Sequence, residues 1–487
     1  MIYSLEELFK QNAQFPPSTE IKRRDSYRIN ELLMEDEPWT AMPDYKKRVN
    51  FVLGNMRTAG DSHYFYDANY WQDLVDKMQE LIYGEPPEYS GSTNEQTAFL
   101  NNLVVDTKFT QKITEGLSDF VGLGDWVTKV ERTDDGYDFT NVNPAIWYPI
   151  VDRTDVKKVL YHVLAWLVNV AKDKYELHVQ IHEKGKYTNL AFAVDKYEPD
   201  AYYIDQVTKQ RINCDLATLG KPLEESKTAF ELGEHPTGLN DFAIIASANN
   251  ARTRSIYGIS DFDKITEGAM EYNVRMTLKN ATLDKHAAPI MYGPYLNGDG
   301  LGDVGNYIQL NQGDQQPNYL VWDASMQAVE NAINQTQEDV ANLSGLGSLL
   351  SSKTFGESQG YDALMIKLAP ALMRTRKKRT ALQDHLKKLL SMLAYGNGMQ
   401  IPEKDITITW KNGIPATEGV RADIAQKHLA TGWSMFDVLT KDYGWTEEMA
   451  EKAIERKKTE SPQLPIFGVT EEEPQETDGS EQGGDNA

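Results

Sequence analysis

Two glycine-rich segments resemble motifs that bind nucleotide phosphates. Gly300-Leu-Gly302-Asp-Val-Gly305 matches GxGxxG, in which a turn between a strand and a helix brings backbone N–H groups to a pyrophosphate. A strand is predicted after this segment instead of a helix, and Asp299 and Asp303 would repel phosphate. We therefore interpret it as a loop without a nucleotide.

Gly347–Thr354 is a near match to the phosphate-binding loop GxxxxGK[ST]. Ser352 stands at the second glycine position, and a helix precedes the segment where the motif requires a strand. We expect no ATPase activity, and we expect Lys353→Ala to leave nucleotide affinity unchanged. If ATP is used in this protein's biology, another chain hydrolyses it.

His178 and His182 have the i, i+4 spacing of a helical zinc pair. Apolar residues alternate with them, which is typical of a strand, and four strand residues would separate the imidazoles by roughly 13 Å. That distance is too long for one metal ion, so we interpret both as surface histidines on a sheet. Cys214 is the only cysteine, which excludes a cysteine-based zinc site. The sequence predicts no catalytic residue, metal or cofactor.

One dense basic run, Arg374-Thr-Arg-Lys-Lys-Arg379, lies within a predicted helix. It could be a solvated helix face, a contact with an acidic neighbouring subunit, or a contact with DNA phosphates. The chain has a net charge of −23, and −16 remains without the acidic residues of 470–487. Because tight non-specific duplex binding needs clustered Lys and Arg, this charge argues against it. A subunit contact is attractive, since a ring requires two unlike complementary surfaces.

Two long helices are predicted on either side of a strand-rich insert. The first helix covers 259–285 with Ser260 and Asp261 as candidate N-caps, and the roughly 24 residues from the caps to Lys285 would measure roughly 35 Å. The insert covers 286–322, and the second helix covers 323–342. A Gly/Ser-rich loop, 343–360, then leads to a helix interrupted by proline. A globular enzyme core seldom needs such an elongated object.

The remaining segments predict an α+β fold of about three domains in 487 residues. Residues 18–83 are mostly helical, Asp134-Asp-Gly136 indicates a hairpin, and strands continue to residue 245. Short helices are predicted at 418–430, 434–443 and 446–458, before a disordered acidic tail. The longest apolar run has 13 residues, which is too short to cross a bilayer.

Several strings together resemble the portal proteins, or head–tail connectors, of tailed double-stranded DNA bacteriophages, of the type common in phages of Gram-positive hosts. The strongest are Ser255-Ile-Tyr-Gly-Ile-Ser-Asp261 before a long helix and Ala288-Pro-Ile290 after it. Others are Leu81-Ile-Tyr-Gly-Glu-Pro-Pro87, Tyr161-His-Val-Leu-Ala-Trp166, His182-Glu-Lys-Gly-Lys-Tyr187 and Glu357-Ser-Gln-Gly-Tyr-Asp-Ala-Leu364. Gln359 departs from the Ser-Gly that related chains often place there, which leaves the loop boundary open.

The resemblance implies the parts of a portal subunit. They are an α/β wing (1–258, with 361–414 returning to it), stem helices (259–285 and 323–342), a clip (286–322), a tunnel loop (343–360), crown helices (415–461) and the acidic tail (462–487). Similar proteins form a homo-oligomeric ring, twelvefold in the virion, at the capsid vertex. DNA passes through its channel without tight binding, and no membrane is involved.

The implied partners are the terminase packaging motor, a head–tail adaptor, and the major capsid and scaffolding proteins, with assembly in the host cytoplasm. Together with the basic run and the Gly-rich segments, this interpretation predicts functional residues in three places. The tunnel loop would use Ser344, Gly345, Gly347, Ser351, Ser352, Lys353 and Glu357, and the clip would dock partners through Tyr295, Asn297, Asp299 and Asp303. The subunit interface would use Arg374, Arg376, Lys377, Lys378 and Arg379. The alternatives are another ring-forming virion adaptor, although adaptors are usually much shorter, and an unrecognised soluble enzyme.

Overall fold

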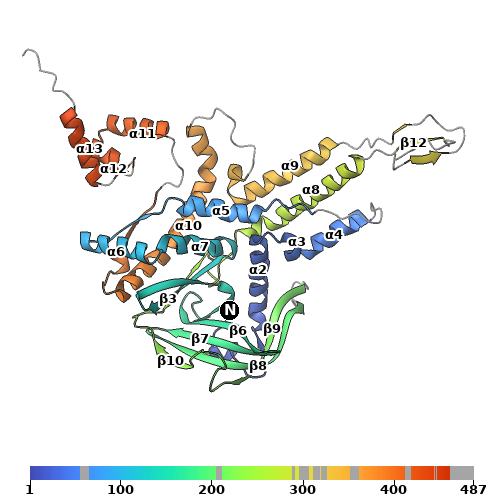
Figure 1. The fold of residues 1–487 in the computed structure, drawn as a ribbon, viewed down its shortest axis with the longest axis horizontal. Helices are drawn as coiled ribbons and strands as arrows, with labels where there is room; N and C mark the ends of the chain where they lie inside the picture. Colours follow the sequence, from blue (N-terminus) through green and yellow to red (C-terminus); the bar gives the residue numbers. More distant parts are fainter. Residues whose placement is uncertain are drawn as a thin grey trace, which may run out of the picture. The chain divides into compact units, whose positions relative to one another are not determined.

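The computed structural model describes most of the chain. The described residues are 1–54, 65–204, 211–287, 291–294, 307–310, 318–319, 326–350, 361–411, 418–441, 443, 445 and 447–460. They belong to two compact units, Met1–Gly413 and Ile414–Ala487 (Figure 1). The predicted clip residues (Tyr295, Asn297, Asp299, Asp303) and four of the predicted tunnel-loop residues (Ser351, Ser352, Lys353, Glu357) lie outside the described residues.

The first unit contains a large antiparallel sheet in the order β1-β9-β8-β7-β6-β5, with β10 pairing to β8. Its strands are β1 (Gln14–Phe15), β5 (Trp147–Val151), β6 (Val159–Ala171), β7 (Lys174–Glu183), β8 (Lys186–Ile204), β9 (Arg211–Pro222) and β10 (Gly233–Pro236). Alternating apolar residues such as Val163, Leu177 and Val179 are buried on one face, beneath α1 (Leu5–Leu8). The predicted strands from Val159 to Val194 are confirmed.

A second sheet has the order β11-β3-β4, formed by β11 (Ile244–Ala248), β3 (Asp125–Thr133) and β4 (Gly136–Val142). The hairpin predicted at Asp134-Asp-Gly136 is confirmed, with Thr133 opposite Gly136. Helices α7 (Phe109–Gly122) and α10 (Tyr361–Gly396) pack on this sheet, and Trp126 is buried between them. There Trp126 stacks on His385 of α10 with ring centroids 3.9 Å apart.

The helices before the sheets form α2 (Ser18–Met34), α3 (Pro38–Ala41), α4 (Pro43–Gly54), α5 (Tyr70–Tyr83) and α6 (Asn94–Asp106). The apolar residues that recur at spacings of three and four on α5 are all buried: Trp71, Leu74, Val75, Met78, Leu81 and Ile82. A two-stranded sheet of β2 (Glu88–Ser90) and β15 (Thr407–Thr409) joins this region to the chain that follows α10.

The two predicted rods are α8 (Thr266–Ala287) and α9 (Met326–Ser344), which pack against each other (Figure 1). The first begins later than the predicted residue 259, because residues 259–261 are held by other parts of the unit and 262–264 form a short 3₁₀ turn. Between the rods, β12 (Met291–Pro294), β13 (Tyr307–Leu310) and β14 (Asn318–Tyr319) form a small mixed sheet. The short strands expected in this insert are therefore present.

The second unit contains α11 (Glu418–Ala430), α12 (Met435–Lys441) and α13 (Glu447–Glu460). Trp433 stacks on His428 with centroids 4.3 Å apart, and the Lys441 ammonium lies 4.9 Å from the Trp433 ring centroid. Within the described part of the whole chain, no helix combines the length and apolarity needed to span a bilayer.

Candidate functional site

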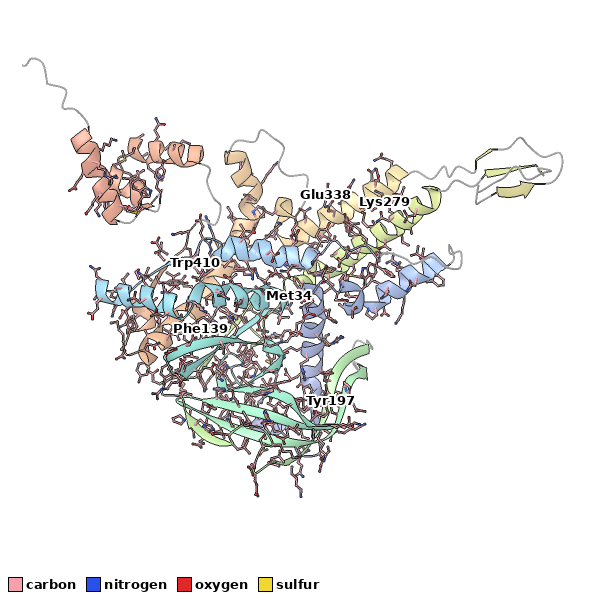
Figure 2. All side chains as sticks on the ribbon, in the orientation of Figure 1. Met34, Phe139, Tyr197, Lys279, Glu338 and Trp410 are labelled. Carbon is pink, nitrogen blue, oxygen red and sulfur yellow. The ribbon has the colours of Figure 1, made fainter. Side chains whose placement is uncertain are left out.

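The rods α8 and α9 run antiparallel and are joined by polar contacts along their length. The Lys279 ammonium lies 3.2 Å from Glu330, and Arg275 donates to the Ala332 carbonyl and to Thr336, each at 3.0 Å. As the residue number rises on α8, the contacted number falls on α9. Figure 2 shows Lys279 and Glu338 on the two rods.

Apolar contacts and a third helix complete this pair. A Cβ at Gly268 would lie 3.0 Å from a methyl of Val340, so the helices approach closely there. On α9, Ile333 and Val340 are buried, whereas Val329 is exposed. Helix α4 lies on the other side of α8 (Figure 1). Its Arg48 forms an ion pair with Glu271 of α8 at 2.7 Å. Helix α8 is therefore held by α9 on one side and by α4 on the other.

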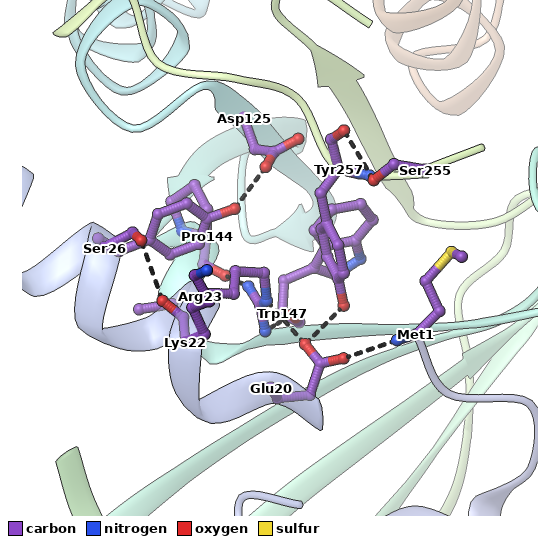
Figure 3. A network of polar contacts seen from close by, with 12 residues as sticks. Met1, Glu20, Lys22, Arg23, Ser26, Asp125, Pro144, Trp147, Ser255 and Tyr257 are labelled. Atoms are coloured by element: carbon purple, nitrogen blue, oxygen red, sulfur yellow. Dashed lines mark hydrogen bonds and ion pairs between the residues drawn. The ribbon is translucent and has the colours of Figure 1, made fainter. Parts of the chain in front are cut away.

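The segment that precedes α8, Ser255–Asp261, contacts α2, β3 and α7, and Figure 3 shows Tyr257 beside Glu20 of α2. Tyr257 donates to the Glu20 carboxylate at 3.0 Å, and the Gly258 amide donates to the Asp125 carboxylate at 2.8 Å. Ser260 donates to the Gly122 carbonyl at 2.6 Å. A Cβ at Gly258 would lie 1.9 Å from the Gly124 carbonyl oxygen, so only glycine fits. These residues anchor the start of the rod.

A buried guanidinium supports the same segment from α2. Arg23 bonds the Glu20 carboxylate at 2.7 Å and donates to the carbonyls of Pro144 and Trp147 (Figure 3). Burial would raise the pKa of Glu20, but Arg23 and the N-terminal amine outweigh it and the pKa lies below its ordinary value. Asp125 accepts a short hydrogen bond from Tyr27, and burial raises the pKa of Asp125 to about 6.

Asp261 is the centre of a second buried cluster. One carboxylate oxygen lies 2.7 Å from Arg374 Nη2, and the other lies 2.7 Å from Lys378 Nζ. The Asn249 and Asn250 side-chain amides donate to Oδ1 at 3.2 and 2.9 Å. Burial would raise the pKa of Asp261, but the two cations hold it below the ordinary value. Burial also lowers the pKa of Lys378 to about 8, despite the carboxylate beside it.

The basic run therefore divides into two groups. Arg374 and Lys378 bind Asp261 inside the chain, and Arg379 donates to the carbonyls of Leu81, Ile82 and Lys411. Arg376 and Lys377 are exposed. Lys378, by contrast, is only 3% exposed, and the subunit contact of the basic run stays a prediction.

A signal for the buried lysine was present in the sequence. The buried positions of α10 recur at spacings of three and four residues: Leu368, Ala371, Thr375, Lys378, Leu382, His385 and Leu389. This is the period of a helix face that packs on a core. A lysine within such a stripe requires a buried anion, and the sequence analysis did not identify Asp261 as that anion.

The described start of the predicted tunnel loop is a packed turn. Ser344 is buried and its hydroxyl donates to the Ala341 carbonyl at 2.6 Å, while the Leu346 amide donates to that hydroxyl at 3.0 Å. Gly345 and Gly347 have φ values of 73° and 51°, which favour glycine. Leu346 and Leu350 are buried. Helix α9 thus extends two residues beyond the predicted boundary at residue 342.

The two strand histidines were predicted wrongly as surface residues. They lie on a strand as expected, but His178 is 3% exposed and stacks on Phe230 at 4.3 Å, while His182 is fully buried. The residues after β9 cover this face of the sheet, and a local pattern does not reveal that layer. His178 also contacts Glu176 and Ser226, each at 3.3 Å. Neither histidine belongs to a cluster of three or more candidate metal ligands among the described residues.

None of the curated proteins matches the chain. The profile of the family described as "Phage portal protein, SPP1 Gp6-like" matches residues 65–463, which include the anchored segment before α8, both rods, α10 and α11 to α13. Because this match covers most of the sequence, the chain belongs to the SPP1 Gp6-like family of phage portal proteins.

Proposed function

We propose that this phage portal protein assembles as a closed, head-to-tail ring, twelvefold in the particle, with its DNA channel formed around the α8–α9 rods. Membership of the family makes the chain a structural portal for phage DNA packaging and a virion component at the capsid vertex. The closed ring, its symmetry and its particular contacts are what we propose beyond family membership. A heterologous contact closes into a ring when its rotation divides a full turn.

The paired rods are the observation that best supports this proposal. Helix α8 has 22 residues and α9 has 19, so they measure roughly 33 and 28 Å at 1.5 Å per residue. Their outer ends are joined by the insert that carries the small sheet, and α9 ends in the glycine turn at 345–347. This order of parts fits a stem that carries a clip at one end and a tunnel loop at the other.

The charge of α9 suits a wall along which DNA must move. Its sequence contains Glu330, Glu338 and Asp339 and neither Lys nor Arg. A basic surface would release counterions from the duplex and hold it, whereas an acidic one does not. We propose that this helix contributes to the channel wall and that the predicted tunnel loop, residues 343–360, projects into the channel.

The remaining contacts follow from the same arrangement. We propose that Tyr295, Asn297, Asp299 and Asp303 in the clip dock the terminase motor and the head–tail adaptor. Capsid and scaffolding proteins would contact the ring elsewhere, during assembly in the host cytoplasm. Arg376 and Lys377 would face acidic residues of the neighbouring subunit. No enzymatic role is proposed for the chain.

Adding positive charge to the tunnel loop tests the channel assignment. Ser351→Arg combined with Ser352→Arg should leave rings intact in negative-stain images but slow or stop packaging, because arginines in the channel would hold phosphates. The matched control places the same two arginines on the exposed residues Asn101 and Asn102 of α6. Normal packaging by the loop variant would contradict the assignment, and a wild-type chain that stays monomeric at all concentrations would contradict the ring.

Proline substitutions in the turn would test the channel assignment less clearly, because they change the turn and the loop together. Gly345 and Gly347 adopt φ of 73° and 51°, and proline requires about −65°. Gly345→Pro with Gly347→Pro would therefore break the packed turn as well as stiffen the loop.

A further inference from the structure

Gly345 and Arg374 are in close contact at the end of α9. A Cβ at Gly345 would lie 2.6 Å from Arg374 Nη1 and 3.0 Å from its Cδ. The Gly345 amide donates to the Asn342 carbonyl at 3.1 Å, so the backbone of the turn is itself fixed to α9. The arginine side chain therefore lies directly against the turn.

The other side of the same guanidinium binds the start of α8. Arg374 Nη2 lies 2.7 Å from Oδ1 of Asp261, whose side chain is fully buried. The Asp261 amide donates to the Val121 carbonyl at 3.0 Å, which ties this residue to α7. Because α8 and α9 are antiparallel, the start of one rod lies beside the end of the other, and Arg374 from α10 contacts both.

We propose that Arg374 is a positioning residue that fixes the turn at 344–347 against the base of α8 and transmits movement of either one to the other. The proposal rests on the proposed function only for its consequence, namely that the base of the stem sets where the tunnel loop leaves α9. Lys378 has a different role, because it binds the second oxygen of Asp261 and Asn249 Oδ1 and has no described contact with the turn.

Arginine suits this position for a geometric reason. Its planar guanidinium presents several nitrogens in a fixed fork, so one edge can bind the carboxylate while another packs on the glycine backbone. Lysine carries one ammonium, which could keep the ion pair with Asp261 but would leave the turn without support. Glycine is required at position 345, because any side chain there would displace the guanidinium of Arg374.

Hydrogen exchange of the assembled full-length protein, without DNA, tests the link from both ends. Gly345→Ala should accelerate exchange of the amides at Asp261 and Phe262 by on the order of tenfold, since the new methyl pushes Arg374 off Asp261. Gly347→Ala is the matched control, because it lies in the same turn with positive φ and no described atom lies within 4 Å of its Cβ position. It should leave exchange at Asp261 unchanged.

Conversely, Arg374→Lys should accelerate exchange at Gly345 and Leu346 by a similar factor, whereas Arg132→Lys, at an exposed arginine of β3, should not. If Gly345→Ala fails to fold, the Arg374→Lys measurement tests the proposal by itself. Equal exchange at Asp261 in both glycine variants, or unchanged exchange at Leu346 in Arg374→Lys, would overturn the proposal. Failure of the proposed function would show differently, as normal packaging by the tunnel-loop arginine variant, with the exchange results unaffected.

Discussion

The ammonium of Lys378 lies 2.7 Å from Oδ2 of Asp261, and both side chains are buried. Arg374 binds the other oxygen, so one carboxylate is shared by two cations. Removing charges from water costs several kcal/mol per ion, and only a close counter-charge offsets that cost. The stability of this cluster therefore depends much more on the aspartate than on either cation alone.

Asp261→Asn should destabilise the protein by about 3–5 kcal/mol, because it leaves two buried cations without an anion. Lys378→Met should cost less, since it leaves a one-to-one pair of Asp261 and Arg374. Urea denaturation of the purified variants measures both. Asp44→Asn is the control, because its ion pair with Lys47 is exposed and should contribute nothing measurable. An equal cost for Asp261→Asn and Lys378→Met would contradict this account.

Local pattern predicted the elements whose packing is local. The stripe on α5, the hairpin at Asp134–Gly136 and the alternation of β6 and β7 each follow from residues close in sequence. The family resemblance was also carried by such strings, above all the segment Ser255–Asp261. Those features needed no knowledge of distant contacts.

The roles of single residues in that same segment could not be predicted locally. Ser260 and Asp261 have the composition of helix caps, but Gly122, Asn249 and α10 supply their partners. Tertiary contacts thus delay the start of α8 to Thr266. The partner of a buried cation and the layer that covers a sheet face both come from residues far along the chain, which a local period does not reveal.

His182 should make the fold sensitive to acid. It is fully buried, neither ring nitrogen has a hydrogen-bond partner among the described residues, and it lies opposite His162 in the β6–β7 ladder. Burial, with Lys129 and His162 nearby, lowers the pKa of His182 to about 3. Below about pH 6.5 the unfolded chain binds a proton that the folded chain does not, so stability falls as pH falls.

His182→Phe should remove the stability loss at low pH that His182 causes. At pH 7.5 the substitution should leave stability unchanged, because no hydrogen bond is broken. We compare the free energy of unfolding of the variant with that of wild type at each pH. From pH 7.5 to pH 5.5 this difference should shift by roughly 1.4 kcal/mol in favour of the variant. Urea denaturation at both pH values measures the change. Other titrating groups contribute equally to the variant and to wild type, so their effects cancel in this comparison. One of them is Asp119, because burial raises its pKa to about 7. The same substitution at the partly exposed His235 is the control, and an identical pH dependence in the His182 variant and wild type would refute the prediction.

Gly116 of α7 should tolerate no side chain. A Cβ there would lie 2.0 Å from Nε1 of Trp126, and that indole is held by a hydrogen bond to Asn141 and by stacking on His385. Overpacking costs about 1–3 kcal/mol, and so short a contact with a fixed ring lies at the upper end. The gain of about 1 kcal/mol in helix propensity does not offset it.

Gly116→Ala should therefore lower the free energy of unfolding by roughly 2 kcal/mol, measured by urea denaturation. The control is Gly54→Ala in α4, where no described atom lies within 4 Å of the Cβ position. It should change stability little. If both variants are equally stable, the helix α7 does not pack on Trp126 as the structure has it.

Arg376 and Lys377 should contribute to ring assembly, since they are the exposed members of the basic run and the chain is strongly acidic. Replacing both with Glu turns attraction into repulsion at every interface of the ring, and exposed pairs contribute up to about 1 kcal/mol each. Sizing chromatography should therefore show a shift from rings to smaller species. The shift should shrink at 1 M salt, where the Debye length is roughly 3 Å. Arg132→Glu with Lys404→Glu, both exposed, makes the same charge change elsewhere and should leave rings intact. Intact rings in the Arg376 and Lys377 variant at low salt would show that these charges do not lie between subunits.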